Sequence, residues 1–191
     1  AHPKTFGAFA DPSTYTEFRY QQFDAQLKSQ DLIEKVAREF EQTFGRYYGG
    51  LLDGYHLDDA EVVLVTLGSV VGTIKDAIDA MRAEGKKVGL LKVRSYRPFP
   101  VQALRKALKN AAVIAVLEKD VAIGGEAGLV TDLKAAFYNS STRTPIIGFT
   151  GGLGGRDITV RDIRKIVARA EAARKGIESE FEFLDLRTEI L

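Results

Sequence analysis

The stretch EVVLVTL at residues 61–67, followed by Gly68-Ser69, decides the fold class of this chain. A nearly uninterrupted apolar run of this kind is typical of a strand that is covered on both faces, as strands of parallel sheets are. The apolar residues after the turn recur at helical spacing, and Gly85 ends that helix: they are Val70, Ile74, Ile78 and Met81. Residues 61–85 therefore predict a unit of strand, turn and helix.

The same unit recurs three times along the chain. Further apolar runs, each followed by a helical pattern, lie at residues 88–93, 112–117 and 145–149. The last helix is expected to begin near Thr159, which has capping-box spacing with Asp162. Strands that alternate with helices form right-handed crossovers and a sheet covered on both sides. The sequence predicts a three-layer α/β/α fold with a mostly parallel sheet, in which residues 181–186 form an exposed edge strand.

A different pattern precedes the first unit. Residues 12–45 are helical in pattern, with Thr14 and Glu17 at capping-box spacing and Gly45 at the end. Aromatic residues crowd this end of the chain: Phe6, Phe9, Tyr15, Phe18, Tyr20, Phe23, Tyr47, Tyr48 and Tyr55. We expect an N-terminal helical arm over residues 1–57 and an α/β domain over residues 58–191. The aromatics either pack the arm on that domain or contact a partner.

Composition excludes several classes of function. Lys and Arg total 27 against 26 Asp and Glu, with no sustained run of one sign, which argues against a nucleic-acid partner. The chain has no cysteine, so it supplies no disulfide, no thiol nucleophile and no Cys-ligated iron-sulfur cluster, and a cytoplasmic location is expected. No apolar run approaches the roughly 20 residues that span a bilayer, so no membrane partner is expected. The first residue is not methionine, and we expect a processed or excised piece.

The turns that follow the strands are the candidate binding sites, because ligands of doubly wound sheets bind at the carboxyl ends of the strands. Gly68 and Ser69 lie where a strand meets a helix N-terminus, whose free N–H groups and positive dipole attract a carboxylate or phosphate. Arg97, which follows the next strand, is the side chain expected to assist in binding this anion. The alternative is that Ser69 only caps the helix. No catalytic residue, cofactor ligand or metal ligand is predicted.

Two glycine-rich segments resemble nucleotide-binding loops but lack their essential parts. Residues 124–128 lack the G-x-G spacing of a dinucleotide fingerprint and are separated from their strand. Residues 151–157 follow a strand directly, but they lack the Gly-Lys-Ser/Thr ending of a phosphate-binding loop. The second segment therefore predicts a tight backbone turn rather than a nucleotide site.

Five ordered segments resemble one family. They are EFRYQQ at 17–22, DAE at 59–61, LGSVVGT at 67–73, YRPFP at 96–100 and LGGRDI at 153–158. Together they are similar to the C-terminal, transketolase C-terminal-like domain of the alpha chain of pyruvate:ferredoxin oxidoreductase and related 2-oxoacid:ferredoxin oxidoreductases. The resemblance covers nearly the whole chain, and the ordered set is more specific than any single segment.

The resemblance implies a thiamine-diphosphate enzyme that decarboxylates a 2-oxoacid, passes electrons through iron-sulfur clusters to ferredoxin and leaves an acyl group on coenzyme A. It also implies that thiamine diphosphate, Mg²⁺ and the clusters are held by other domains or subunits. We expect this chain to be a structural and subunit-interface domain, inactive alone. The alternative is a free-standing domain that binds a small anion. One departure is Glu118-Lys119-Asp120, where the family often has an arginine instead of Lys119.

Overall fold

The computed structural model describes residues 2–4, 7 and 9–191. Phe6, one of the aromatic residues expected in the arm, lies outside these described residues. Among the described residues, no helix combines the length and the apolar character that a membrane span needs.

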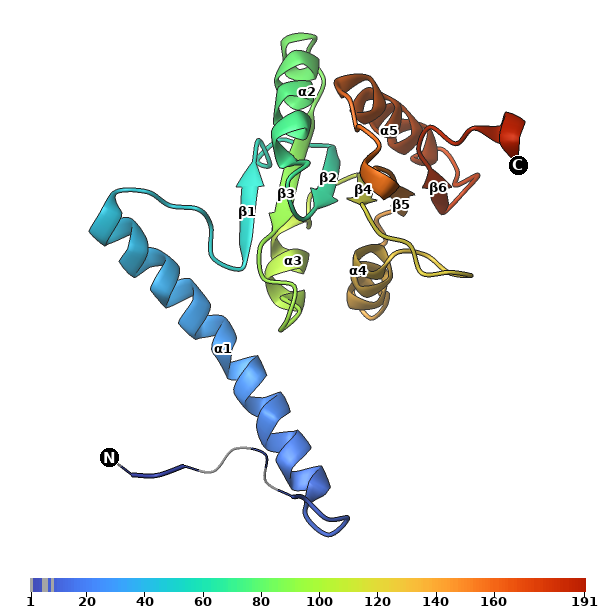
Figure 1. Cartoon of the computed structure of the whole chain (residues 1–191). Coiled ribbons are helices and arrows are strands. Elements are labelled where there is room, and N and C mark those ends of the chain that lie inside the picture. Colours follow the sequence, from blue (N-terminus) through green and yellow to red (C-terminus); the bar gives the residue numbers. More distant parts are fainter. Residues whose placement is uncertain (1, 5–6, 8) are drawn as a thin grey trace.

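Six strands form a single sheet, whose order across the sheet is β1-β3-β2-β4-β5-β6 (Figure 1). Strand β1 is antiparallel to β3, and all other neighbours are parallel, with Val62 opposite both Val88 and Val113. The strands are β1 (Leu52–Tyr55), β2 (Val62–Thr66), β3 (Val88–Val93), β4 (Val113–Glu118), β5 (Ile146–Thr150) and β6 (Phe181–Phe183). The four central strands and the edge strand β6 confirm the pattern read from the sequence.

Helices cover both faces of the sheet. Helices α2 (Val71–Ala83) and α5 (Val160–Ala173) pack on one face, and α3 (Val101–Ala107) and α4 (Gly128–Tyr138) pack on the other. Successive residues of β2 alternate between the two cores, because side chains of a strand point to opposite faces: Leu64 joins the first core, and Val63 and Val65 join the second. The expected three-layer α/β/α architecture is therefore confirmed.

The capping box of α5 forms as the sequence predicts. The Asp162 N–H donates to the Thr159 hydroxyl, and Asp162 Oδ2 accepts from the Thr159 N–H at 2.9 Å. The glycine-rich segment before it is a tight turn, as expected, with a short 3₁₀ helix η1 (Leu153–Gly155) and positive φ at Gly152 and Gly154. A second 3₁₀ helix, η2 (Thr188–Ile190), lies close to the last residue.

Helix α1 (Tyr15–Phe44) forms the arm, and none of its residues is buried. Thr14 is the residue before its first turn, but its side chain does not cap the helix. This corrects the expected capping box with Glu17. Among the described residues, helix α1 itself is joined to later parts of the chain by two side-chain hydrogen bonds: Gln30 Nε2 donates to the Phe99 carbonyl at 3.3 Å, and the Leu51 N–H donates to Glu34 Oε1 at 2.8 Å. In Figure 1 the start of α1 extends well away from the sheet.

Strand β1 was not anticipated from the sequence, which places residues 52–55 in the arm. These residues pair with β3 from Leu52 opposite Val93 to Tyr55 opposite Leu90. The segment is only four residues long and contains a glycine, so it lacks the apolar run that marks the central strands. The sheet therefore begins before residue 58, within the range expected for the arm.

Candidate functional site

The carboxyl ends of β2, β4 and β5 meet at one edge of the sheet, because these strands are parallel neighbours. The chain leaves β2 through α2 on one face and reaches β4 through α3 on the other face. The order of the strands along the chain reverses between β2 and β4, and such a switch point opens a crevice where ligands of this fold class bind. The predicted site at Gly68 and Ser69 follows β2 at this edge.

The Gly68–Ser69 turn is open. Gly68 has a φ of +88°, and no heavy atom outside its neighbours lies within 4 Å of the place where a Cβ would be. Both residues are exposed, and α2 begins after Val70, with no side chain hydrogen-bonded to its first turn. The alternative reading of Ser69 as the helix cap is therefore corrected. The free N–H groups of α2 remain available, and anion binding there stays a prediction.

Arg97 contacts Asp132 and Tyr96 rather than the predicted anion site. Its guanidinium donates to Asp132 Oδ2 of α4 at 2.7 Å, and it lies 4.1 Å from the centre of the Tyr96 ring. The Tyr96 hydroxyl donates to the same oxygen at 2.6 Å. These partners belong to the face covered by α3 and α4, whereas Gly68 leads into α2 on the opposite face. Among the described residues, no hydrogen bond or ion pair brings Arg97 to the Gly68–Ser69 turn.

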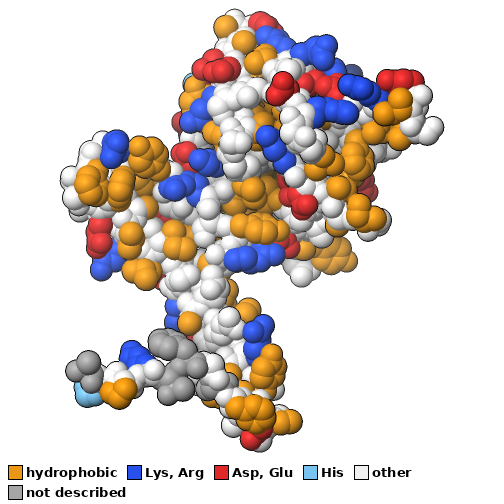
Figure 2. Space-filling view, viewed as in Figure 1, with side chains coloured by type: hydrophobic (Ala, Val, Ile, Leu, Met, Phe, Trp, Pro, Cys, Tyr) orange, Lys and Arg blue, Asp and Glu red, His pale blue; other side chains and the backbone are white. Residues whose placement is uncertain are grey.

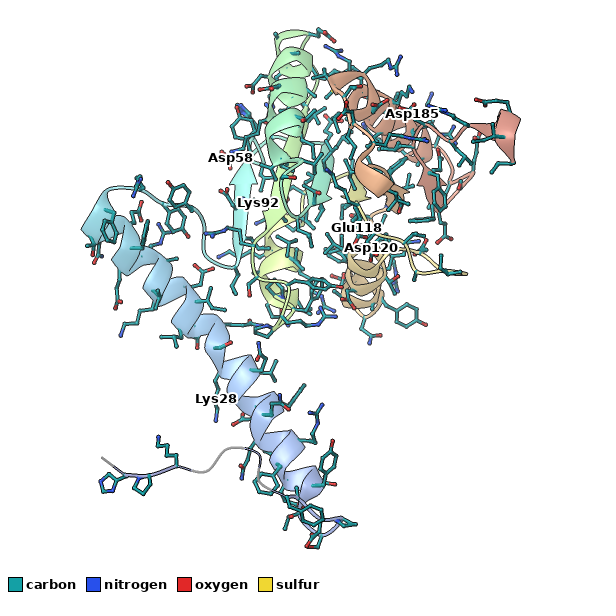
Figure 3. The ribbon with its side chains drawn as sticks, viewed as in Figure 1. Lys28, Asp58, Lys92, Glu118, Asp120 and Asp185 are labelled. Carbon is teal, nitrogen blue, oxygen red and sulfur yellow. The ribbon has the colours of Figure 1, made fainter. Side chains whose placement is uncertain are left out.

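Glu118 is the residue at this edge that sequence reasoning missed. It ends β4 and is 8% exposed. Its carboxylate accepts from the Leu129 N–H at 2.7 Å and from the Val130 N–H at 2.9 Å, so it caps α4 (Figure 3). Burial raises the pKa of Glu118, and the two N–H donors only partly offset this. An acidic residue at the end of an otherwise apolar strand was the signal in the sequence.

Acidic groups gather around this cap. The carboxylates of Asp120 and Asp132 also raise the pKa of Glu118, and Figure 3 shows Asp120 beside Glu118 above α4. Lys119 lies with its side chain against Gly152 and forms no ion pair among residues 2–4, 7 and 9–191. The side of the edge next to α4 is therefore unfavourable for an anion.

The cofactors implied by the resemblance need particular ligands. The sequence has no cysteine to bind an iron-sulfur cluster. Within the part of the chain that the structure describes, no group of three or more His, Cys, Asp or Glu side chains is placed to hold a metal ion.

The arm carries a large exposed apolar surface. Large apolar side chains of α1 that are about half exposed or more include Tyr15, Phe18, Tyr20, Phe23, Leu32, Val36 and Phe44. Figure 2 shows hydrophobic side chains gathered along this helix. Exposed apolar surface of this extent marks an interaction site rather than a solvated face. The arm therefore joins the carboxyl edge as a candidate functional surface.

Comparison with known families identifies the chain. Residues 60–163, more than half of the chain, match the family described as pyruvate:ferredoxin oxidoreductase core domain II. The chain belongs to this family. The matched range runs from two residues before β2 into the first turn of α5, so it covers the central parallel strands and the carboxyl edge.

The relatives of this chain include several oxidoreductase subunits. The chain is 52% identical over 191 residues to pyruvate synthase subunit PorA of Methanosarcina barkeri, covering 99% of this chain and 48% of that protein. It is 39% identical to PorA of Pyrococcus furiosus, covering 100% and 48%. It is 40% identical to ketoisovalerate oxidoreductase subunit VorA of Pyrococcus horikoshii, covering 93% and 44%. The chain therefore spans about half the length of these relatives.

Two solved structures share the fold of this chain, although their sequences are less than 20% identical to it. A split-gene transketolase, described as an inactive β4 tetramer, matches with a TM-score of 0.51 at 19% identity, over 64% of this chain and 42% of that chain. The 2-oxoglutarate:ferredoxin oxidoreductase from Magnetococcus marinus matches with a TM-score of 0.54 at 18% identity, over 91% and 25%. Residues 58–191 are about seven-tenths of the chain. The second match must therefore include part of the arm.

Proposed function

We propose that this chain is the structural and subunit-interface domain of the alpha chain of a thiamine-diphosphate-dependent 2-oxoacid:ferredoxin oxidoreductase, with pyruvate as the 2-oxoacid. The observation that carries the proposal is the 52% identity, along nearly the whole chain, to a protein named pyruvate synthase subunit PorA. Membership of the core domain II family supports it. Ferredoxin and the other domains or subunits of the enzyme are the proposed partners.

The proposal gives this chain no catalytic step. Thiamine diphosphate, where it is bound, supplies the carbanion chemistry of 2-oxoacid decarboxylation. The chain has no cysteine for an iron-sulfur cluster, and the family resemblance implies that the diphosphate and its Mg²⁺ are held elsewhere in the enzyme. The proposal therefore assigns these groups and coenzyme A to other parts of the enzyme. This chain contributes a rigid α/β body and the apolar surface of α1, against which those parts assemble.

The free-standing anion-binding domain remains the competing function. It uses the Gly68–Ser69 turn, with Arg97 as the side chain expected to assist, and the hydrogen bonds of Arg97 go to Asp132 and Tyr96 instead. No contact in the described residues favours this alternative over the oxidoreductase domain.

Isothermal calorimetry with thiamine diphosphate and Mg²⁺ tests whether the cofactor is bound by this chain or by other parts of the enzyme. We expect no saturable heat with the isolated chain, because the proposal assigns the diphosphate and its Mg²⁺ to other parts of the enzyme. The complete oxidoreductase, stripped of cofactor, is the positive control and should give a saturable titration. Saturable binding to the isolated chain, abolished when Mg²⁺ is omitted, would contradict the assignment of the cofactor to other domains.

A further inference from the structure

A groove runs between α1 and the α/β body. Its wall on α1 is the apolar stripe of Leu32, Val36 and Phe40, and its other wall includes Tyr48 and Arg94. We call this feature the α1 groove. Its volume is about 680 Å³. Leu32 and Val36 are 58% and 51% exposed, so the stripe is left largely open to solvent.

The accessible surface of the chain is larger than its mass accounts for. The area is 12,011 Å², whereas a folded monomer of 21.0 kDa is expected to expose about 9,000 Å². The excess of about 3,000 Å² is well above the roughly 800 Å² that each partner buries in a standard interface. The exposed arm is the part of the fold that departs from a compact shape. The excess area is large enough for the interface with a permanently bound partner.

The lining of the groove favours a helix as its occupant. An extended or irregular segment would bury backbone N–H and C=O groups that need partners from the groove. The groove offers few, since the side chains with polar groups in its lining are Ser29, Tyr48, Arg94 and Ser95. The Arg94 guanidinium already donates to the Tyr48 and Gly49 carbonyls, both at 2.6 Å. A helix satisfies its own backbone groups and needs only apolar side chains to fill this space.

We propose that the α1 groove receives an amphipathic helix from the half of the polypeptide that the relatives carry beyond this chain. The proposal rests on the proposed function. The matched PorA and VorA proteins are about twice as long as this chain, so each carries a further half on the same polypeptide. A segment on the same polypeptide is present at an effective concentration of about millimolar, which favours it over a second copy of the chain. The match to one-quarter of a longer oxidoreductase chain extends into the arm, so part of the arm has a counterpart within a longer polypeptide.

Single cysteines in α1 test this inference. The 191 residues contain no cysteine, so Val36→Cys reports from inside the groove without interference from this chain. Lys35→Cys is the matched control, because Lys35 is the adjacent residue, does not line the groove and has a side chain that is 72% exposed. Alkylation by N-ethylmaleimide is followed by mass spectrometry of the α1 peptide, in the isolated chain and in the complete polypeptide with its subunits.

We expect alkylation of Val36→Cys to slow by at least about tenfold in the complete protein, while Lys35→Cys changes by less than about twofold. Equal rates for Val36→Cys in both samples, or equal slowing at both positions, would overturn the proposal. Protection of Val36→Cys in the isolated chain that increases with protein concentration would identify a second copy as the occupant and would also overturn it. Labelling needs no turnover, so the result is separate from whether the complete protein oxidises a 2-oxoacid.

Discussion

Phe149→Ala is expected to lower the free energy of unfolding of the isolated chain by about 3–5 kcal/mol. Phe149 is 1% exposed and is among the largest fully buried side chains. It lies on β5, in the core that α2 and α5 cover. Truncation removes the apolar contacts of the ring and leaves a cavity between the sheet and two helices, which cannot close because both layers are tightly packed. Urea denaturation followed by circular dichroism measures the loss.

Phe183→Ala is the matched control for this prediction. Phe183 lies on the neighbouring edge strand β6, opposite Thr150, and is 45% exposed. Its truncation removes about half as much buried surface and leaves no enclosed cavity, so we expect a loss of at most about 1.5 kcal/mol. Equal losses for the two variants would mean that Phe149 is not enclosed in the core between the sheet and helices α2 and α5.

Asp162→Ala is expected to lower the free energy of unfolding by about 2 kcal/mol at pH 7. Burial raises the pKa of Asp162, but hydrogen bonds from the Thr159 hydroxyl and N–H and from Lys165 outweigh it and lower the pKa to about 2. A carboxyl whose pKa is lower in the folded state than in the unfolded state stabilises the fold when it is ionised. This contribution is complete above the unfolded value of 3.8 and is lost as the pH falls from there towards 2.

The pH dependence separates this effect from a general loss of packing. The difference between wild type and Asp162→Ala should shrink when urea denaturation is repeated near pH 2, because about half of the folded-state carboxyls are then protonated and most of the stabilisation by ionisation is lost. Asp157→Ala is the control, since Asp157 is an exposed acid in the preceding turn. A difference that stays constant between pH 7 and pH 2, or an equal effect of Asp157→Ala, would show that the capping box does not hold the start of α5.

The central sheet could be predicted from the sequence because of how it is buried. Strands β2, β4 and β5 are covered on both faces, so every residue is buried and the apolar run is continuous. Strand β1 is a short edge strand with a glycine and leaves no such pattern. The capping box at Thr159 was also predictable, because both partners lie within four residues of each other.

The candidate site was less predictable, because it depends on contacts between distant residues. Glu118 caps α4 through Leu129 and Val130, which reach it only after the loop folds back over the edge of the sheet. Arg97 is joined to Asp132, 35 residues away, and no spacing in the sequence indicates that pair. The apolar stripe of α1 is visible at helical spacing, but its exposure depends on where the arm lies relative to the body.

Ferredoxin reduction by the complete oxidoreductase is the most direct test of the proposed function. The assay supplies thiamine diphosphate, Mg²⁺, coenzyme A and oxidised ferredoxin, and adds a panel of 2-oxoacids one at a time. We predict rapid reduction with pyruvate, none when coenzyme A or the 2-oxoacid is omitted, and none with the isolated chain under any condition. A complete, folded assembly with its cofactors bound that reduces ferredoxin with no member of the panel would contradict the proposal.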